Sequence, residues 1–194
     1  MRSGILTIIF CLSISACGLR SIPIAKNDVD AAIAEVTNQY KRRADLVPSL
    51  VEVVKGYAKH ERETLEQVIG ARAKATQITL DPKKVTPESL TEFQKAQGNL
   101  TQALGRLMVI VERYPDLKAN QNFRDLQIQL EGTENRIAVA RKRNIDAIKK
   151  FNDLVSAPPE SWTNSLVYHH EKLAQWTLPE TERARAEQPP SVKF

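Results

Sequence analysis

Residues 130–145 read LEGTENRIAVARKRNI and combine an apolar helical repeat with charged groups in the same register. The apolar residues that share one helix face here and just beyond are Leu130, Ile137 and Ile148. On a helix that advances about 100° per residue, Asn144 lies near the centre of this face, Arg141 about 40° away and Glu134 about 60° away. The stretch therefore predicts a helix that buries one side and carries polar groups into the core.

An earlier apolar face covers residues 29–68. The residues that point within about 60° of Val54 are Val29, Ile33, Val36, Tyr40, Val47, Leu50, Tyr57, Leu65 and Val68. Pro48 interrupts this stretch because it has no amide hydrogen and its ring crowds the carbonyl of Ala44. Either one helix kinks there, or Asp45 caps a new helix with Pro48 in its first turn. We expect a break or sharp kink near Pro48.

Two further helices follow. Thr86 is the predicted N-cap of the first and Pro87 its opening residue. Its apolar side comprises Leu90, Phe93, Leu100, Leu104, Leu107, Val111 and Tyr114. The second starts at Asp116, Asn120 or Asn122 and ends before the prolines at 158–159. Its apolar side comprises Phe123, Leu126, Leu130, Ile137, Ile148, Phe151 and Val155.

Long helices with apolar stripes and short connectors bury those stripes by packing side by side. We therefore predict an all-α fold, an elongated antiparallel bundle of three to four helices over residues 28–157. Beyond Pro158 the periodicity fades, and residues 158–194 are predicted to form an extended tail. Trp162 and Trp176 lie in this tail. Docking on the bundle is their simplest role, and contact with lipid or a partner stays open.

The composition agrees with a helical protein, because only 7 of 194 residues are glycine and 26% are charged. The net charge is +5. It is 5 − 1 = +4 for a chain from which an amino-terminal signal containing Arg2 has been cleaved. No dense block of lysine and arginine accompanies this mild excess, which argues against nucleic-acid binding.

The amino terminus, MRSGILTIIFCLSISACG, has the outline of a secretory signal. Its apolar run from Ile5 to Ile14 is much shorter than the roughly 20 residues of a transmembrane helix. Residues 14–17, ISAC, resemble a bacterial lipobox, in which cleavage precedes a cysteine that carries lipid. Cleavage of an ordinary signal after Ala16 is the alternative. We predict a signal peptide over residues 1–16, lipid on Cys17 and a tether over residues 17–27.

Charged and polar groups also lie in core register on the earlier helix. The full set comprises Arg43, Glu61, Arg72, Glu134, Arg141 and Asn144. A lone buried charge is costly, so Glu61 and Glu134 are expected to pair with arginines of the set. Three interpretations remain: an internal polar layer that sets helix register, a surface that meets a partner protein, or exposure at the bundle edge.

No catalytic motif accompanies these groups. His60 begins HERET, which departs from the HExxH zinc spacing. The two consecutive histidines at residues 169–170 lie in the predicted tail. Neither a nucleophile elbow nor a phosphate-binding glycine loop occurs, and both cysteines fall within the first seventeen residues. We expect no enzymatic activity, no cofactor and no metal. A hydrolase would require a pocket lined by unpaired carboxylates or histidines.

Three long strings, residues 41–75, 106–127 and 130–155, resemble the LemA family of bacterial membrane-anchored helical proteins. The similarity runs from about residue 28 to 157, and the PPSVKF ending also resembles the family's tail. It implies a helical bundle outside the cytoplasm, anchored at its amino terminus, without established catalysis. Many members keep an uncleaved transmembrane helix, whereas a lipobox takes its place here.

The expected function is that of a lipid-anchored envelope protein that binds an unidentified envelope partner as an interaction or scaffold module. Gly18 follows the cysteine and favours the outer membrane in a Gram-negative host. The alternative is a homo-oligomer that organises or remodels the membrane.

Overall fold

The computed structural model describes the backbone of residues 2–176 and the side chains of residues 19–176. This part of the chain is helical and contains no strand, so the predicted all-α class is confirmed. The elements are α1 (Arg2–Tyr57), α2 (Arg62–Gln77), α3 (Pro87–Val111), α4 (Pro115–Ala119), α5 (Gln121–Ser156), α6 (Glu160–Thr163) and a π-helical turn, η1 (Asn164–Tyr168).

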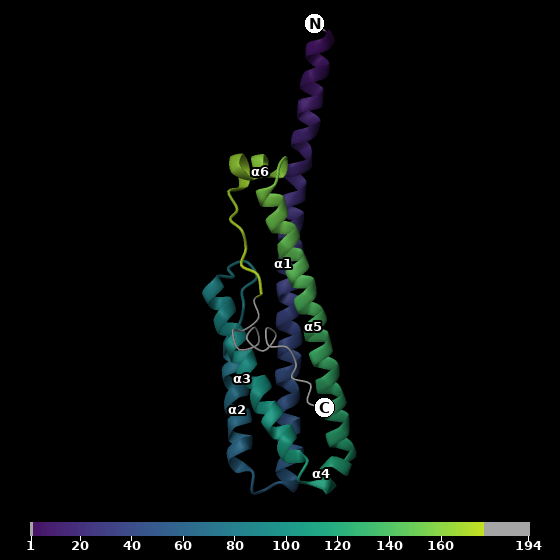
Figure 1. Ribbon diagram of the computed structural model, residues 1–194, viewed down its shortest axis with the longest axis vertical. Coiled ribbons are helices and arrows are strands. Elements are labelled where there is room, and N and C mark those ends of the chain that lie inside the picture. The colour runs from purple at the N-terminus through teal and green to yellow at the C-terminus, as the bar shows by residue number, and fades with distance from the viewer. Residues whose placement is uncertain (1, 177–194) are drawn as a thin grey trace, which may run out of the picture.

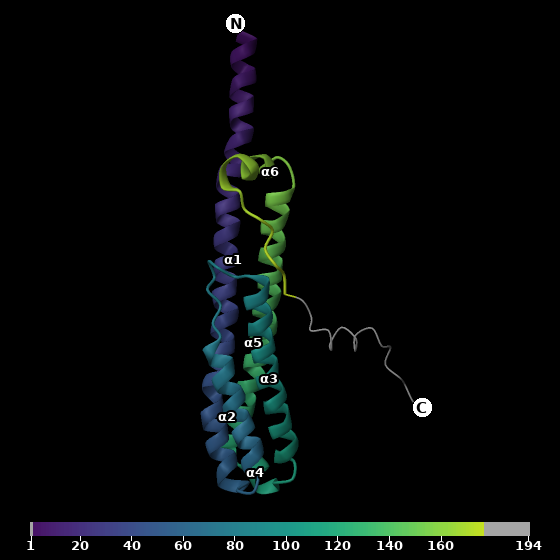
Figure 2. The same ribbon diagram turned by 90° about the vertical axis from the view of Figure 1, so that its left-hand side faces the viewer.

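The long helices form an elongated antiparallel bundle, as predicted (Figure 1). Helices α1 and α5 contact each other along most of the bundle, and α2 packs on both α3 and α1. The amino-terminal part of α1 projects alone past α6, whereas α4 lies at the opposite end (Figures 1 and 2). We call these the projecting end and the far end.

Two predicted helix starts are confirmed. The hydroxyl of Thr86 accepts a hydrogen bond from the amide of Ser89 (3.1 Å), the Ser89 hydroxyl accepts one from the amide of Thr86 (3.0 Å), and Pro87 opens α3. Of the three candidates for the next start, Asn120 caps α5, because its Oδ1 accepts from the amide of Phe123 (3.1 Å).

Of the break or sharp kink predicted near Pro48, the break is wrong, because α1 continues through Pro48 as a single helix. The chain instead leaves α1 after Tyr57 and reverses into α2. Gly56, next to that end, costs about 1 kcal/mol relative to alanine within a helix. The reversal allows Leu65 and Val68 to join the same core cluster as α1 residues.

The ends of the bundle differ from the prediction. Part of the predicted tether, from residue 19 to 27, lies in α1, where Ile22 and Ala25 are buried. In the predicted tail, residues 158–159 form a turn, residues 160–168 are helical and residues 169–176 lack regular structure. Residues 177–194 lie outside the described part of the chain, as do the side chains of the predicted signal peptide and of Cys17.

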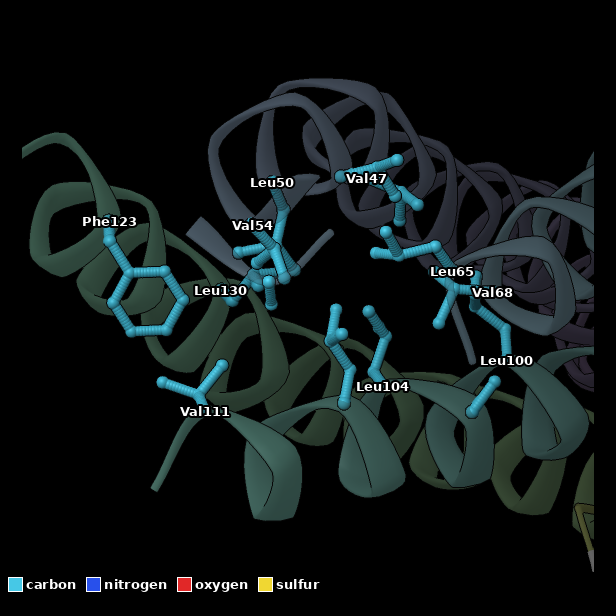
Figure 3. Close-up of a cluster of buried hydrophobic side chains, with 14 of the residues drawn as sticks. Val47, Leu50, Val54, Leu65, Val68, Leu100, Leu104, Val111, Phe123 and Leu130 are labelled. Atoms are coloured by element: carbon cyan, nitrogen blue, oxygen red, sulfur yellow. The ribbon is translucent and has the colours of Figure 1, made fainter. Parts of the chain in front are cut away.

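The core has two halves. The far half joins α1, α2, α3, α4 and α5, and Figure 3 shows its labelled members, Val47, Leu50, Val54, Leu65, Val68, Leu100, Leu104, Val111, Phe123 and Leu130. The projecting half joins α1, α3, α5 and the chain after η1, and it includes Val29, Val36, Tyr40, Phe93, Ile148, Phe151 and Trp176.

Candidate functional site

Arg43 is only 1% exposed and is the centre of a polar network. Its Nη1 donates to Thr101 Oγ1 (2.7 Å) and Glu134 Oε1 (2.8 Å), and its Nη2 donates to Oε1 (2.9 Å) and the backbone O (3.1 Å) of Gln97. Gln97 Nε2 then donates to the carbonyl of Ala75 (3.0 Å). These five residues, which we call the Arg43 layer, connect α1, α2, α3 and α5.

The Arg43 layer separates the two halves of the core. The apolar residues that flank it are Tyr40 and Val47 on α1, Phe93 and Leu100 on α3, and Leu130 and Ile137 on α5. A helix that slipped by one turn would move its own layer residue into an apolar half and leave Arg43 short of partners. Because an unpaired buried charge is strongly destabilising, the layer favours one axial register.

Arg72 has a different partner from the one expected. Proline has no amide hydrogen, so Pro48 leaves the carbonyl of Ala44 without its helical donor. Arg72 Nε donates to that carbonyl (2.8 Å). The arginine therefore satisfies an acceptor that the proline releases, and it ties α2 to α1 beside the Arg43 layer.

Glu61 lies apart from the Arg43 layer, at the far end of the bundle. Its Oε1 accepts hydrogen bonds from Arg113 Nη2 and the hydroxyl of Tyr114, both at 3.0 Å. The hydrogen bond to Glu61 raises the pKa of the Tyr114 hydroxyl. The expected pairing of Glu61 with an arginine of the predicted set is wrong, because the α1–α2 reversal carries this residue to the end of the rod.

Arg141 packs on an aromatic cluster. Its guanidinium carbon lies 5.3 Å from the ring centroid of Trp176, within cation–π range. Trp176 stacks on Tyr40 (6.4 Å between centroids) and meets Phe93 edge-on (6.3 Å). Burial raises the pKa of Tyr40, and the positive charges of Arg141 and Arg43 offset part of that effect. Among the described residues Arg141 forms no ion pair, so its expected carboxylate partner is not found there.

Asn144 is fully buried on α5, and neither atom of its amide group has a hydrogen-bond partner within the described residues. It lies outside the Arg43 layer, in the projecting half of the core. An unpaired buried amide costs about 1–3 kcal/mol. The structure thus brings Arg43 and Glu134 together, places Arg72 and Arg141 nearby through other contacts, and keeps Glu61 and Asn144 apart.

Two polar side chains of the Arg43 layer were missed in the sequence. Gln97 and Thr101 follow Phe93 by four and eight residues, so they fall on the apolar side of α3. That periodicity could have identified them, because it places these two neutral polar side chains in core register in the same way as it places the charged residues of the predicted set.

The described side chains offer little for covalent chemistry. They contain no group of three or more histidines, cysteines or acids that could hold a metal. A surface hollow beside α5 is lined by residues that include Asp146, Lys149, Lys150 and Asp153. Both aspartates form ion pairs, with Lys142 (2.7 Å) and Lys149 (2.8 Å) respectively. Glu160 also lines this hollow and forms no ion pair among the described residues. The hollow thus has a single unpaired carboxylate and no histidine.

Comparison with known proteins places these features in a family. The sequence model of the LemA family matches residues 32–194. Protein LemA of Metamycoplasma hominis is 27% identical over 140 residues, which cover 72% of this chain and 58% of that relative. The chain thus spans less than two thirds of the relative's length. Because the family model covers most of the sequence, including the Arg43 layer, the chain belongs to the LemA family.

Proposed function

We propose that this protein is a lipid-anchored, non-enzymatic interaction module of the bacterial cell envelope. The observation that carries the proposal is the position of Cys17 in the amino-terminal part of α1. This part of the helix forms the projecting end (Figure 2). Lipid on this residue would attach the rod at one end. Two or three acyl chains, each contributing about 0.8 kcal/mol per buried methylene, would keep the attachment durable.

The internal contacts support binding in preference to catalysis. Arg43 and Glu134 pair with each other, Arg72 donates to a carbonyl, and Arg141 lies on Trp176. These groups hold the helices together and leave the outer surface of the rod to meet a partner. A helix as long as α5, with 36 residues, spans about 54 Å, so contacts can form well away from the bilayer.

The anchor is tested by changing Cys17 to Ser in the full chain. The variant should lose palmitate labelling and leave the membrane fraction, because serine has no thiol to accept diacylglycerol. Cys11→Ser is the matched control and should keep both properties, since it changes the other cysteine of the sequence. Continued palmitate uptake by Cys17→Ser would disprove the anchor.

The partner is tested by cross-linking in intact cells through a photoreactive residue that replaces Val109 on α3, which is 72% exposed. A specific envelope protein captured by the membrane-anchored chain and lost from Cys17→Ser would support the interaction module. Capture of further copies of the same chain, together with deformation of liposomes by the purified protein, would support the membrane-organising oligomer instead.

No helix within residues 2–176 is both long enough and apolar enough to span a bilayer.

A further inference from the structure

Exposed apolar side chains of α6 and η1 lie at the projecting end of the bundle. There α6 packs beside α1, where the amino-terminal part of α1 projects past it (Figures 1 and 2). Trp162, Leu166 and Val167 are 63%, 80% and 53% exposed. Trp162 and Leu166 are four residues apart and therefore lie on the same side of consecutive helical turns, and Val167 is adjacent to Leu166 in the sequence. We call residues 157–170, which carry these side chains, the cap. A group of large apolar side chains at one end of a molecule indicates a binding surface.

The cap also has few charges. Its sequence, APPESWTNSLVYHH, contains no lysine, arginine or aspartate, a single glutamate, Glu160, and two histidines, although Asp, Glu, Lys and Arg make up 26% of the whole chain. A surface that faces only water has no reason to avoid charge, whereas a surface that enters lipid does, because burying an ion is costly. Tryptophan is enriched at membrane interfaces, where its apolar ring and polar N–H are both accommodated.

A hydrogen bond fixes the cap close to the proposed anchor. Pro23 has no amide hydrogen and leaves the carbonyl of Leu19 without its helical donor. The hydroxyl of Tyr168 donates to this carbonyl (2.7 Å). Cys17 precedes Leu19 by two residues, a rise of about 3 Å along a helix. A lipid on Cys17 would therefore bring the bilayer to the cap.

The cap is held in shape by its own polar contacts. Asn164 donates to the carbonyl of His170 and accepts from its amide, both at 2.9 Å. Asn152 of α5 forms the same pair of bonds with Leu173, at 3.0 and 2.8 Å. These bonds hold the first residue of η1 against the chain that follows it and tie that chain to α5, which keeps Leu166 and Val167 in their exposed positions.

We propose that the cap inserts into a phospholipid bilayer at the boundary between headgroups and acyl chains, with Trp162, Leu166 and Val167 as the inserted side chains. The bundle then stands on the membrane with a fixed end and does not swing from a flexible tether. This inference rests on the proposed lipid anchor, and it adds a second attachment made by the folded domain itself.

The test uses the full chain, purified from cells after palmitate labelling and reconstituted into phosphatidylcholine–phosphatidylglycerol vesicles with brominated acyl chains. Trp176→Phe leaves Trp162 as the remaining tryptophan, and Trp162→Phe leaves Trp176. On reconstitution the emission of Trp162 should shift to shorter wavelength and be strongly quenched by bromine. The emission of Trp176, which is buried, should change little.

A charged variant separates insertion from simple proximity. Leu166→Asp with Val167→Asp, in the Trp176→Phe background, should lose most of the quenching while keeping its palmitate. Val109→Asp on α3 is the matched control, since it places a charge on an equally exposed apolar position in another helix, and it should retain the quenching.

Two results would overturn the inference, and they are distinguishable. A palmitoylated chain whose Trp162 escapes bromine and remains accessible to aqueous acrylamide would overturn the cap and leave the anchor intact. A chain without palmitate would overturn the anchor and the inference that rests on it. If Trp176→Phe loses helical circular dichroism, the difference between the unsubstituted chain and Trp162→Phe gives the same measurement.

Discussion

Arg43 donates hydrogen bonds from both terminal nitrogens to groups on two other helices, α3 and α5. A guanidinium presents its donors in a rigid plane, so the acceptors must meet it at fixed positions. The sequence predicted that charges in core register must pair, and Glu134 was in the predicted set. It could not predict Gln97 or Thr101 as partners, because such pairs depend on the axial offset between helices, which no local pattern contains.

The buried hydrogen bonds of Arg43 predict a loss of stability when this side chain is replaced. Arg43→Met should lower the free energy of unfolding by about 3 kcal/mol, because Gln97 would keep a buried amide without its partner. The estimate stays at the low end because the side chain of Glu134 is 47% exposed and can regain water. Arg42→Met, at the exposed neighbouring position, should stay within about 0.5 kcal/mol of the unsubstituted protein in urea unfolding. Equal midpoints and slopes for the two variants would show that the Arg43 layer adds no net stability.

At the scale of the element, α1 contains two prolines and still forms one helix. In each case a side chain from elsewhere takes the carbonyl that the proline releases. Arg72 donates to Ala44 and Tyr168 to Leu19, across sequence separations of 28 and 149 residues. Local reasoning identified the missing donor at Pro48 and inferred a break or sharp kink. It could not identify the replacement donor, because that donor reaches the helix only after the chain has folded back.

This compensation can be measured by a double-mutant cycle. Arg72→Met alone should destabilise the bundle by about 1–2 kcal/mol, since the carbonyl of Ala44 loses a charged donor. Pro48→Ala restores the helical donor, so Arg72→Met should cost clearly less in that background, with a coupling energy of about 1 kcal/mol. Urea unfolding of the four proteins provides the cycle. Additive effects would mean that the proline and the arginine act independently.

At the scale of the whole molecule, apolar periodicity predicted the long helices, their buried faces and their antiparallel packing. The same periodicity placed Leu65 and Val68 on the same helix as Val54, because the three side chains would point in the same direction on a continuous helix. That agreement is equally compatible with a chain that reverses between Val54 and Leu65. The contact of Trp176 with the bundle was expected only as the simplest of three roles. A single tryptophan after a proline-rich stretch has no periodicity that would identify the surface it meets.

Trp176 ties the chain after η1 to the bundle through Tyr40, Phe93 and Arg141. Trp176→Ala removes a buried indole, which should cost about 3 kcal/mol. Most of this cost should reduce the free energy that holds residues 169–176 against the bundle. Because 1.4 kcal/mol corresponds to a factor of ten, detachment should become roughly a hundredfold more frequent, and trypsin should cut faster after the exposed Lys172. Trp162→Ala, which truncates an exposed ring, should leave the cleavage rate unchanged in protein without membranes. If both alanine variants are cut at the same rate as the unsubstituted chain, Trp176 does not hold this segment, and the cap must be positioned by Tyr168 and the two asparagines alone.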